Sequence, residues 1–216
     1  MECHFGVAMN LFRGVGRYWR RVAGLLICLA CLLVLPGCWV FSINPLYDES
    51  IKPFDPDLKS DKNLLGNWDH LDDGCHWTLT IVADGQAYHL TMAPGPGCKN
   101  DEKTTRYEAH LVKVDTHYFL DLSPKSDDVC ELCLAVHTFM LFSLENKNLS
   151  LTPFDRNWLD QEIKNKKLAV AHVGGEHEYD AITFTAQSSE LKELLRKYAD
   201  DKTAFKSDDN LLFTKK

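Results

Sequence analysis

The sequence predicts a mainly β fold: an antiparallel β-barrel or sandwich with two short helices, after an N-terminal signal helix. The first observation is a hairpin signal, Asp84-Gly85, with alternating apolar and polar residues on both sides. The second is that similar alternation recurs in many short segments separated by turn residues. The third is that two later segments repeat their apolar residues at helical spacing. Many short strands joined by turns are typical of antiparallel barrels and sandwiches.

Residues 1–37 have the order of parts that an export signal has. Four arginines between positions 13 and 21 precede residues 22–35, an apolar stretch of 14 residues without a charge. As a helix this stretch would reach about 21 Å at 1.5 Å per residue, short of the roughly 30 Å hydrocarbon core. A leader therefore fits better than a transmembrane span, and Pro36-Gly37 breaks the helix directly before Cys38.

Leu35-Pro36-Gly37-Cys38 resembles the lipobox of bacterial lipoproteins, in which a small residue precedes the acylated cysteine. The resemblance implies cleavage between Gly37 and Cys38, and it implies attachment of membrane lipid, palmitate included, to the thiol of Cys38. Because Trp39 rather than aspartate follows the cysteine, it also implies a cell-envelope address at the outer membrane, facing the periplasm. The alternatives are an ordinary cleaved signal, an uncleaved N-terminal anchor and export through the twin arginines at positions 20 and 21.

Residues 38–62 are expected to form a lipid-anchored tether. Pro45, Pro53 and Pro56 oppose both helix interiors and central strands. The same segment carries enough apolar residues that part of it should pack along the domain. The folded domain, residues 63–216, is expected to begin near Leu64 and to be barrel-like with a C-terminal helix.

The charge balance argues against a nucleic-acid partner. Residues 1–38 hold four of the 24 basic residues and one of the 31 acidic residues, so the chain after the leader carries 20 basic against 30 acidic residues. Binding to phosphates needs lysines and arginines gathered on one face. A chain with a net charge of about −10 and only short basic runs does not offer such a face.

The hairpin around Asp84-Gly85 predicts a specific register. A type I′ turn at these two residues makes both strands agree on which face is apolar. The predicted pairs are Ile81 with Tyr88, Leu79 with Leu90, Trp77 with Met92, Thr80 with His89 and Thr78 with Thr91. Further strands are expected at 107–114, 118–122, 135–144, 149–152, 168–173, 181–185 and 211–214.

Two helices are expected late in the chain. Asp155 can cap a helix that carries Trp158, Leu159 and Ile163. Ser188 can cap a second helix, whose apolar residues follow i, i+3, i+4, i+7 spacing. The second helix should therefore lie with its apolar side on the sheet.

Gly66-Asn67-Trp68, followed by a succession of hairpins and a late helix, resembles the lipocalin and calycin pattern. That resemblance implies that Trp68 closes the barrel floor. The chain departs from the pattern in two ways: no arginine near the C-terminus is available to cover the tryptophan, and a helix around Trp158 interrupts the strands.

Four cysteines remain after the leader and Cys38, namely Cys75, Cys98, Cys130 and Cys133. An even number in an exported domain favours disulfides. The turn-prone residues 94–97 can bring Cys98 back toward Cys75, so this pairing is preferred, with Cys130 and Cys133 as the second pair. A zinc site formed by the four thiolates and redox work by the Cys130-x-x-Cys133 motif are the alternatives.

No cofactor and no complete catalytic motif is expected. The loop from His172 to Glu178, with Glu176 and His177, could form a mixed metal site, but an exposed polar turn is the favoured interpretation. The leading hypothesis is a non-enzymatic envelope lipoprotein that binds a small apolar ligand or an envelope partner protein. Trp68, Trp77 and Tyr88 are the candidates for lining its cavity. The alternative is a metal-binding or thiol-redox enzyme that uses Cys130, Cys133 or the loop from His172 to Glu178.

Overall fold

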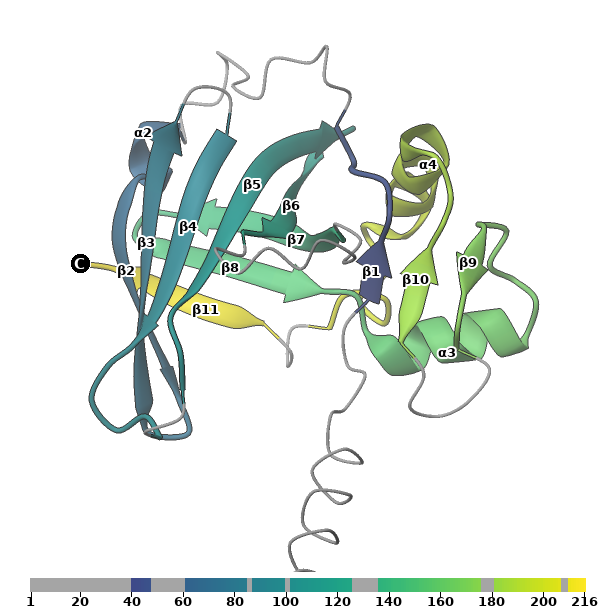
Figure 1. Ribbon diagram of the computed structural model, residues 1–216. Helices are drawn as coiled ribbons and strands as arrows, with labels where there is room; N and C mark the ends of the chain where they lie inside the picture. Colours follow the sequence, from purple (N-terminus) through teal and green to yellow (C-terminus); the bar gives the residue numbers. More distant parts are fainter. Residues whose placement is uncertain are drawn as a thin grey trace, which may run out of the picture. The chain divides into compact units, whose positions relative to one another are not determined.

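The computed structural model describes residues 40–47, 61–84, 87–99, 102–125, 136–175, 181–206 and 210–216 (Figure 1). The chain divides into two compact units, Met1–Gly37 and Cys38–Lys216, and every described residue belongs to the second. Several residues singled out in the sequence lie outside the described residues: Gly37, Cys38, Cys130, Cys133, Glu176, His177 and Glu178.

Eight antiparallel strands form a closed barrel, which confirms the predicted fold class (Figure 1). They are β2 (Gly66–Asp72), β3 (Cys75–Asp84), β4 (Ala87–Pro94), β5 (Thr105–Val114), β6 (His117–Pro124), β7 (Thr138–Glu145), β8 (Asn148–Pro153) and β11 (Leu211–Lys215). Each strand from β2 to β7 pairs with the next one along the chain. The last strand, β11, pairs with both β8 and β2 and so closes the barrel. This up-and-down meander is consistent with the lipocalin-like barrel that the glycine-x-tryptophan pattern predicted.

The predicted register of the β3–β4 hairpin is wrong by two residues. Ile81 pairs with Leu90 rather than with Tyr88, and the ladder ends at the pair Asp84 and Ala87. The residues that connect the strands are therefore 85 and 86, not 84 and 85. Because side chains alternate with a period of two, the shift keeps every side chain on its predicted face.

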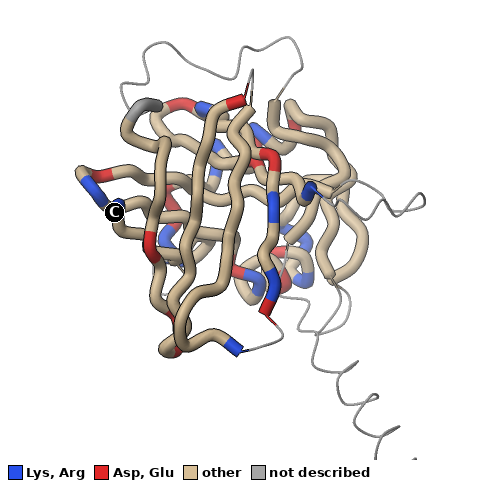
Figure 2. Tube along the Cα trace, turned by 60° about the vertical axis from the view of Figure 1, so that its left-hand side comes forward, with Lys and Arg blue, Asp and Glu red and all other residues tan. Residues whose placement is uncertain are grey.

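Charged residues of both signs are interspersed along the described chain. In the view of Figure 2, lysine and arginine positions are scattered among aspartate and glutamate positions along the described tube.

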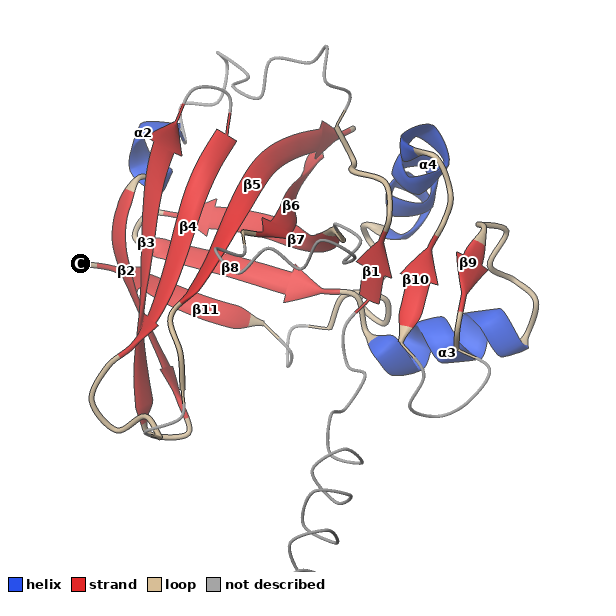
Figure 3. Ribbon diagram, viewed as in Figure 1, coloured by secondary structure: helices blue, strands red, loops and turns tan. Residues whose placement is uncertain are grey.

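A second sheet of three short strands contains parts of the chain that are far apart in sequence (Figure 3). β1 (Val40–Ser42) runs parallel to β10 (Ile182–Phe184), which is antiparallel to β9 (His172–Val173). The described fold thus begins at Val40 rather than near Leu64, and part of the expected tether packs into the domain. Of the predicted strand at 168–173 only β9 forms, and β9 and β10 stand apart from the barrel.

The described helices are α2 (Asp61–Leu64), α3 (Arg156–Lys164) and α4 (Ser188–Tyr198). Asp155 caps α3 as predicted, because its Oδ1 accepts a hydrogen bond from the backbone N–H of Trp158 at 2.6 Å. The cap of α4 is Gln187 rather than Ser188; the Gln187 backbone N–H donates to Oε2 of Glu190 at 3.0 Å. None of the described helices is long and apolar enough to cross a membrane.

Two apolar cores lie on opposite faces of the barrel wall. The barrel interior is filled by residues such as Trp68, Leu79, Ile81, Tyr88, Leu90, Leu120, Met140, Leu149 and Phe213. The outer face of β5 to β7 carries Val112, Val114, Phe119 and Phe139 into a second core with α3, α4 and the three-stranded sheet. Leu191, Leu194 and Leu195 of α4 are buried there, as their spacing predicted.

Candidate functional site

One end of the barrel is filled by large side chains. Trp68, at the start of β2, is completely buried, and its Nε1–H donates to the backbone oxygen of Leu64 at 2.9 Å. The ammonium group of Lys215, at the end of β11, lies 5.3 Å from the centroid of the Trp68 ring. Tyr88 is also buried in this interior core. The described cavities lie toward the other end of the barrel.

The opposite half of the barrel contains a small apolar cavity of about 60 Å³. Side chains from every barrel strand except β2 line this inner cavity: Leu79, Leu90, Met92, Tyr107, Leu122, Thr138, Met140, Leu151, Leu211 and Phe213. Only the hydroxyls of Tyr107 and Thr138 are polar among these side chains. The inner cavity therefore favours an apolar occupant.

A second cavity of about 170 Å³ lies at the rim of the barrel. It is lined by Phe41, Tyr107, Leu122, Pro124, Val136, His137 and Thr138. Tyr107, Leu122 and Thr138 line both cavities, so the rim cavity adjoins the inner one. Phe41 belongs to β1, which means that the N-terminal segment forms part of the wall. A cavity of about 150 Å³ can hold benzene, so the rim cavity is large enough for a single aromatic ring.

A buried polar pair lies beside the rim cavity. Nδ1 of His137 is 2.7 Å from Oδ1 of Asp121, and both side chains are buried. Oδ2 of Asp121 accepts a hydrogen bond from the backbone N–H of Leu46 at 2.6 Å. The backbone of His137 exchanges two hydrogen bonds of 2.8 Å with that of Ser42. The N-terminal segment 40–47 thus covers the pair and satisfies the carboxylate, as a buried charge requires.

The strand pattern explains how Asp121 becomes buried on the outer face of the barrel. It stands in β6 between Leu120 and Leu122, whose side chains point into the barrel interior. Asp121 therefore points outward, into the layer that segment 40–47 closes. The ring of Tyr47 adds to this cover: its centroid lies 3.8 Å from that of His110 and 6.2 Å from that of His137.

The aromatic residues that the sequence suggested as ligand contacts occupy other places. Trp68 and Tyr88 are packed in the interior core, and Trp77 is half-buried in β3. None of the three lines the inner cavity or the rim cavity. Sequence reasoning did not bring His137 and Asp121 together. An isolated acid between two leucines of a strand was the available signal.

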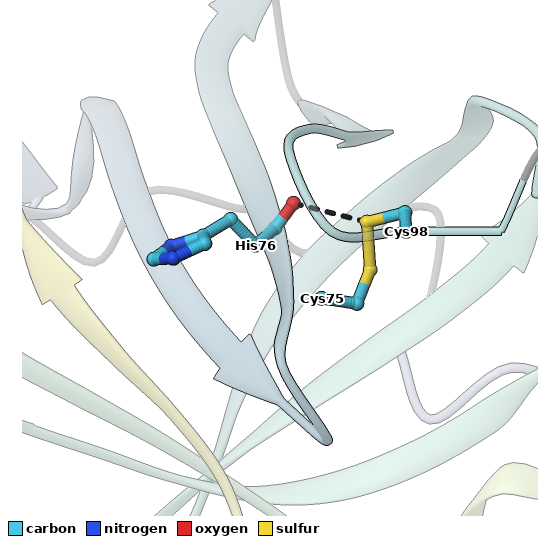
Figure 4. Close-up of a disulfide and its surroundings, with 3 residues drawn as sticks. All are labelled: Cys75, His76 and Cys98. Carbon is cyan, nitrogen blue, oxygen red and sulfur yellow. Dashed lines mark hydrogen bonds between the residues drawn. A yellow bond between two sulfur atoms is a disulfide. The ribbon is translucent and has the colours of Figure 1, made fainter.

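Cys75 and Cys98 form a disulfide, which confirms the preferred pairing (Figure 4). Sγ of Cys98 lies 3.3 Å from the backbone oxygen of His76, a contact rather than a hydrogen bond because an oxidised sulfur has no proton to donate. The turn before Cys98 is held against β3, since the N–H of Gly95 donates to the same oxygen at 2.7 Å. Gly97 has a φ of +85°, and a Cβ there would lie 2.1 Å from the backbone oxygen of Gly74. Glycine is therefore required at this position.

The described residues contain no group of three or more histidines, cysteines, aspartates or glutamates that could hold a metal ion. His172 lies in β9, and its Nδ1 is 2.7 Å from the backbone oxygen of Val170. Its proposed companions at positions 176–178 lie outside the described part of the chain, as do Cys130 and Cys133. The polar side-chain groups that the described residues place at these cavities are therefore the Asp121–His137 pair and the hydroxyls of Tyr107 and Thr138.

No family model matches the chain, and neither does any curated protein or solved structure.

Proposed function

We propose that this protein is a lipid-anchored lipoprotein of the cell envelope whose barrel binds a small apolar ligand at the end opposite Trp68. The observation that carries the proposal is the pair of adjoining apolar cavities, one inside the barrel and one at its rim. Binding sites for small molecules are concave and mostly apolar, with few polar groups. The size of the two adjoining cavities favours a ligand with a single ring or a short chain.

The proposed localisation in the cell envelope has separate support. The apolar leader and the Leu35-Pro36-Gly37-Cys38 sequence favour cleavage before Cys38 and acylation of its thiol. The disulfide between Cys75 and Cys98 agrees with an oxidising compartment such as the periplasm. Two or more acyl chains, at about 0.8 kcal/mol per buried CH₂, would keep the protein on the membrane. We place it at the outer membrane because Trp39 follows the cysteine.

Ligand binding can be tested with p-xylene as the probe. Of the four methionines in the chain, Met92 and Met140 line the inner cavity. Full-length protein labelled with ¹³C in its methionine methyl groups and kept soluble by an amphipathic polymer is titrated with the probe. We expect saturable shifts of the Met92 and Met140 signals. A titration of the polymer alone measures how much probe partitions into it when no protein is present.

Leu122→Phe is the matching variant, because Leu122 lines both cavities and the larger ring would fill them. We expect this variant to weaken p-xylene binding at least tenfold. Val82→Phe is the control, since Val82 is 50% exposed and the added ring should leave the affinity unchanged. Equal binding by wild type and Leu122→Phe would contradict a ligand site in these cavities.

The proposed lipid anchor and localisation are tested by labelling cells with palmitate. The wild-type chain should incorporate the label and fractionate with the outer membrane, and Cys38→Ser should not incorporate it. A wild-type chain that stays unlabelled and is recovered from the cytosol would refute the proposed anchor. Purification of the labelled protein also reveals whether an envelope protein, rather than a small molecule, occupies this end of the barrel.

A further inference from the structure

We infer that the ligand of the rim cavity carries a hydroxyl or another hydrogen-bond donor, and that Nε2 of His137 accepts this hydrogen bond. The inference rests on the proposed function and names the chemical class of its ligand: a small apolar molecule with one donor at its end. The observation behind it is a buried, carboxylate-oriented histidine in the wall of an otherwise apolar cavity.

Asp121 fixes which nitrogen of His137 carries the proton. Its carboxylate can only accept hydrogen bonds, and Oδ2 already accepts one from the N–H of Leu46. Oδ1 lies 2.7 Å from Nδ1 of His137, so Nδ1 donates to it. In a neutral imidazole the other nitrogen then holds a lone pair. Nε2 of His137 is therefore an acceptor whose orientation is set by a buried partner.

This acceptor is available to a ligand. Among the described residues Nε2 of His137 has no hydrogen-bond partner. It is also not among the fully buried polar atoms that lack a partner, so part of its surface is accessible to solvent. The residue as a whole is only 8% exposed and lines the rim cavity. A ligand without a donor would leave this nitrogen without a partner in a dry site, which costs binding free energy.

The other polar side-chain groups of the cavity wall are two hydroxyls. That of Thr138 donates to the backbone oxygen of Val40 at 3.0 Å, but its oxygen keeps lone pairs that accept, so Thr138 needs a control of its own. Tyr107 lines both cavities and its hydroxyl needs a separate control. Because the rim cavity adjoins the inner one, a ligand held at His137 can extend its apolar part toward Met140 and Phe213.

The test compares two probes of nearly equal size. p-Cresol carries a hydroxyl where p-xylene carries a methyl group, and both are titrated against the full chain through the methionine methyl signals. We expect the preference for p-cresol over p-xylene, expressed as the ratio of their affinities, to be about five times larger in the wild type than in His137→Asn. One hydrogen bond of about 1 kcal/mol corresponds to this factor. His137→Asn retains a donor toward Asp121 but lacks the Nε2 acceptor. It also changes the shape of the rim cavity, which affects both probes alike, so the ratio of the two affinities and not either affinity alone is the readout. Tyr107→Phe and Thr138→Val should keep the wild-type ratio.

A second variant reverses the hydrogen-bond role of His137 without removing it. In Asp121→Asn the amide oxygen can still accept from Leu46, while the amide N–H₂ donates to Nδ1 and moves the ring proton to Nε2. Nε2 then becomes a donor. 4-Methylanisole can only accept a hydrogen bond, and 4-ethyltoluene has nearly the same size without an acceptor. We expect the ratio of the affinities for 4-methylanisole and 4-ethyltoluene to be about five times larger in Asp121→Asn than in the wild type.

The outcomes separate the two proposals. If no probe binds the wild type, the proposed ligand-binding function fails. If p-xylene and p-cresol both bind but their ratio is the same in His137→Asn as in the wild type, the function stands and the role of His137 is overturned. A ratio lost only in Tyr107→Phe or only in Thr138→Val would assign the contact to that hydroxyl and would likewise overturn it. Near-ultraviolet circular dichroism of each variant confirms that it is folded.

Discussion

The ammonium group of Lys215 lies over the ring of Trp68, 5.3 Å from its centroid, at the closed end of the barrel. The two residues are paired in the ladder that joins the last barrel strand, β11, to the first, β2. Lys215 also donates a hydrogen bond to the backbone oxygen of Asn63. The lipocalin pattern has an arginine that covers this tryptophan, and the absence of such an arginine was the first departure seen in the sequence. A lysine in the final strand covers the ring instead.

Lys215→Met should lower the free energy of unfolding by about 1 kcal/mol, because the cation–π contact and the bond to Asn63 are lost. Lys215→Arg should keep most of the stability. The control is Lys216→Met: Lys216 pairs with Asp69 at 2.7 Å on the surface, where an ion pair contributes little. Chemical denaturation of the three variants checks this. A loss in Lys216→Met equal to that in Lys215→Met would count against a special role for the contact at Trp68.

Leu46→Ala should destabilise the fold by about 2 to 5 kcal/mol, the usual range for emptying the site of a buried leucine. Leu46 is completely buried in the second core, and its backbone N–H binds Asp121. Ile43→Ala in the same segment is the control, since Ile43 is 37% exposed and should lose much less. Thermal unfolding measures both. Similar, small losses in the two variants would mean that segment 40–47 acts as a loose tether and not as part of the domain.

The double variant Cys75→Ala/Cys98→Ala should lower the free energy of unfolding by about 3 kcal/mol. The disulfide joins residues 23 positions apart, and in the chain-entropy model a loop of this length contributes about that much. Denaturant midpoints of the wild type and the variant provide the measurement. The predicted pair of Cys130 and Cys133 would close a far shorter loop, so Cys130→Ala/Cys133→Ala should cost less. The reverse order of the two losses would refute this account.

The strands and their faces could be predicted from alternation, but the register of the first hairpin could not. Placing the turn at 84–85 or at 85–86 shifts the pairing by two residues and leaves Leu79, Ile81 and Leu90 on the same face. The apolar pattern is therefore equally satisfied by both. The pairing of β1 with β10 was also hidden, because two three-residue strands far apart in the sequence carry no local signal.

The candidate site was only partly visible in the sequence for a related reason. Large aromatics were expected to line a cavity, yet Trp68 and Tyr88 fill the closed half, and the space remains where smaller side chains such as Leu122 and Met92 meet. Asp121 lies in β6, and His137, 16 residues later, directly precedes β7. Segment 40–47 packs over the two side chains and buries their contact. Periodicity along a strand does not reveal this packing.

Thr203→Val should raise the pKa of Asp201 toward the ordinary 3.8 of an aspartate. In the wild type, hydrogen bonds from the Thr203 hydroxyl at 2.6 Å and its backbone N–H at 2.8 Å hold this pKa below that value. A depressed carboxylate pKa stabilises the fold above the unfolded pKa, and this contribution is lost as the pH falls through the folded pKa. The stability difference between wild type and Thr203→Val should therefore be constant near neutral pH and vanish in strong acid.

The side-chain hydroxyl of Thr203 is the group under test, so Thr203→Ser is the matched control and should keep the low pKa of Asp201. The backbone oxygen of Asp201 accepts from the N–H groups of Ala204 and Phe205, whose side chains are buried in the second core. Phe205 in turn lies 4.4 Å, centroid to centroid, from Phe154. The turn thus aligns the chain after α4 for packing. A carboxyl ¹³C titration that gives Asp201 the same pKa in Thr203→Val and Thr203→Ser would show that the hydroxyl does not hold this carboxylate ionised.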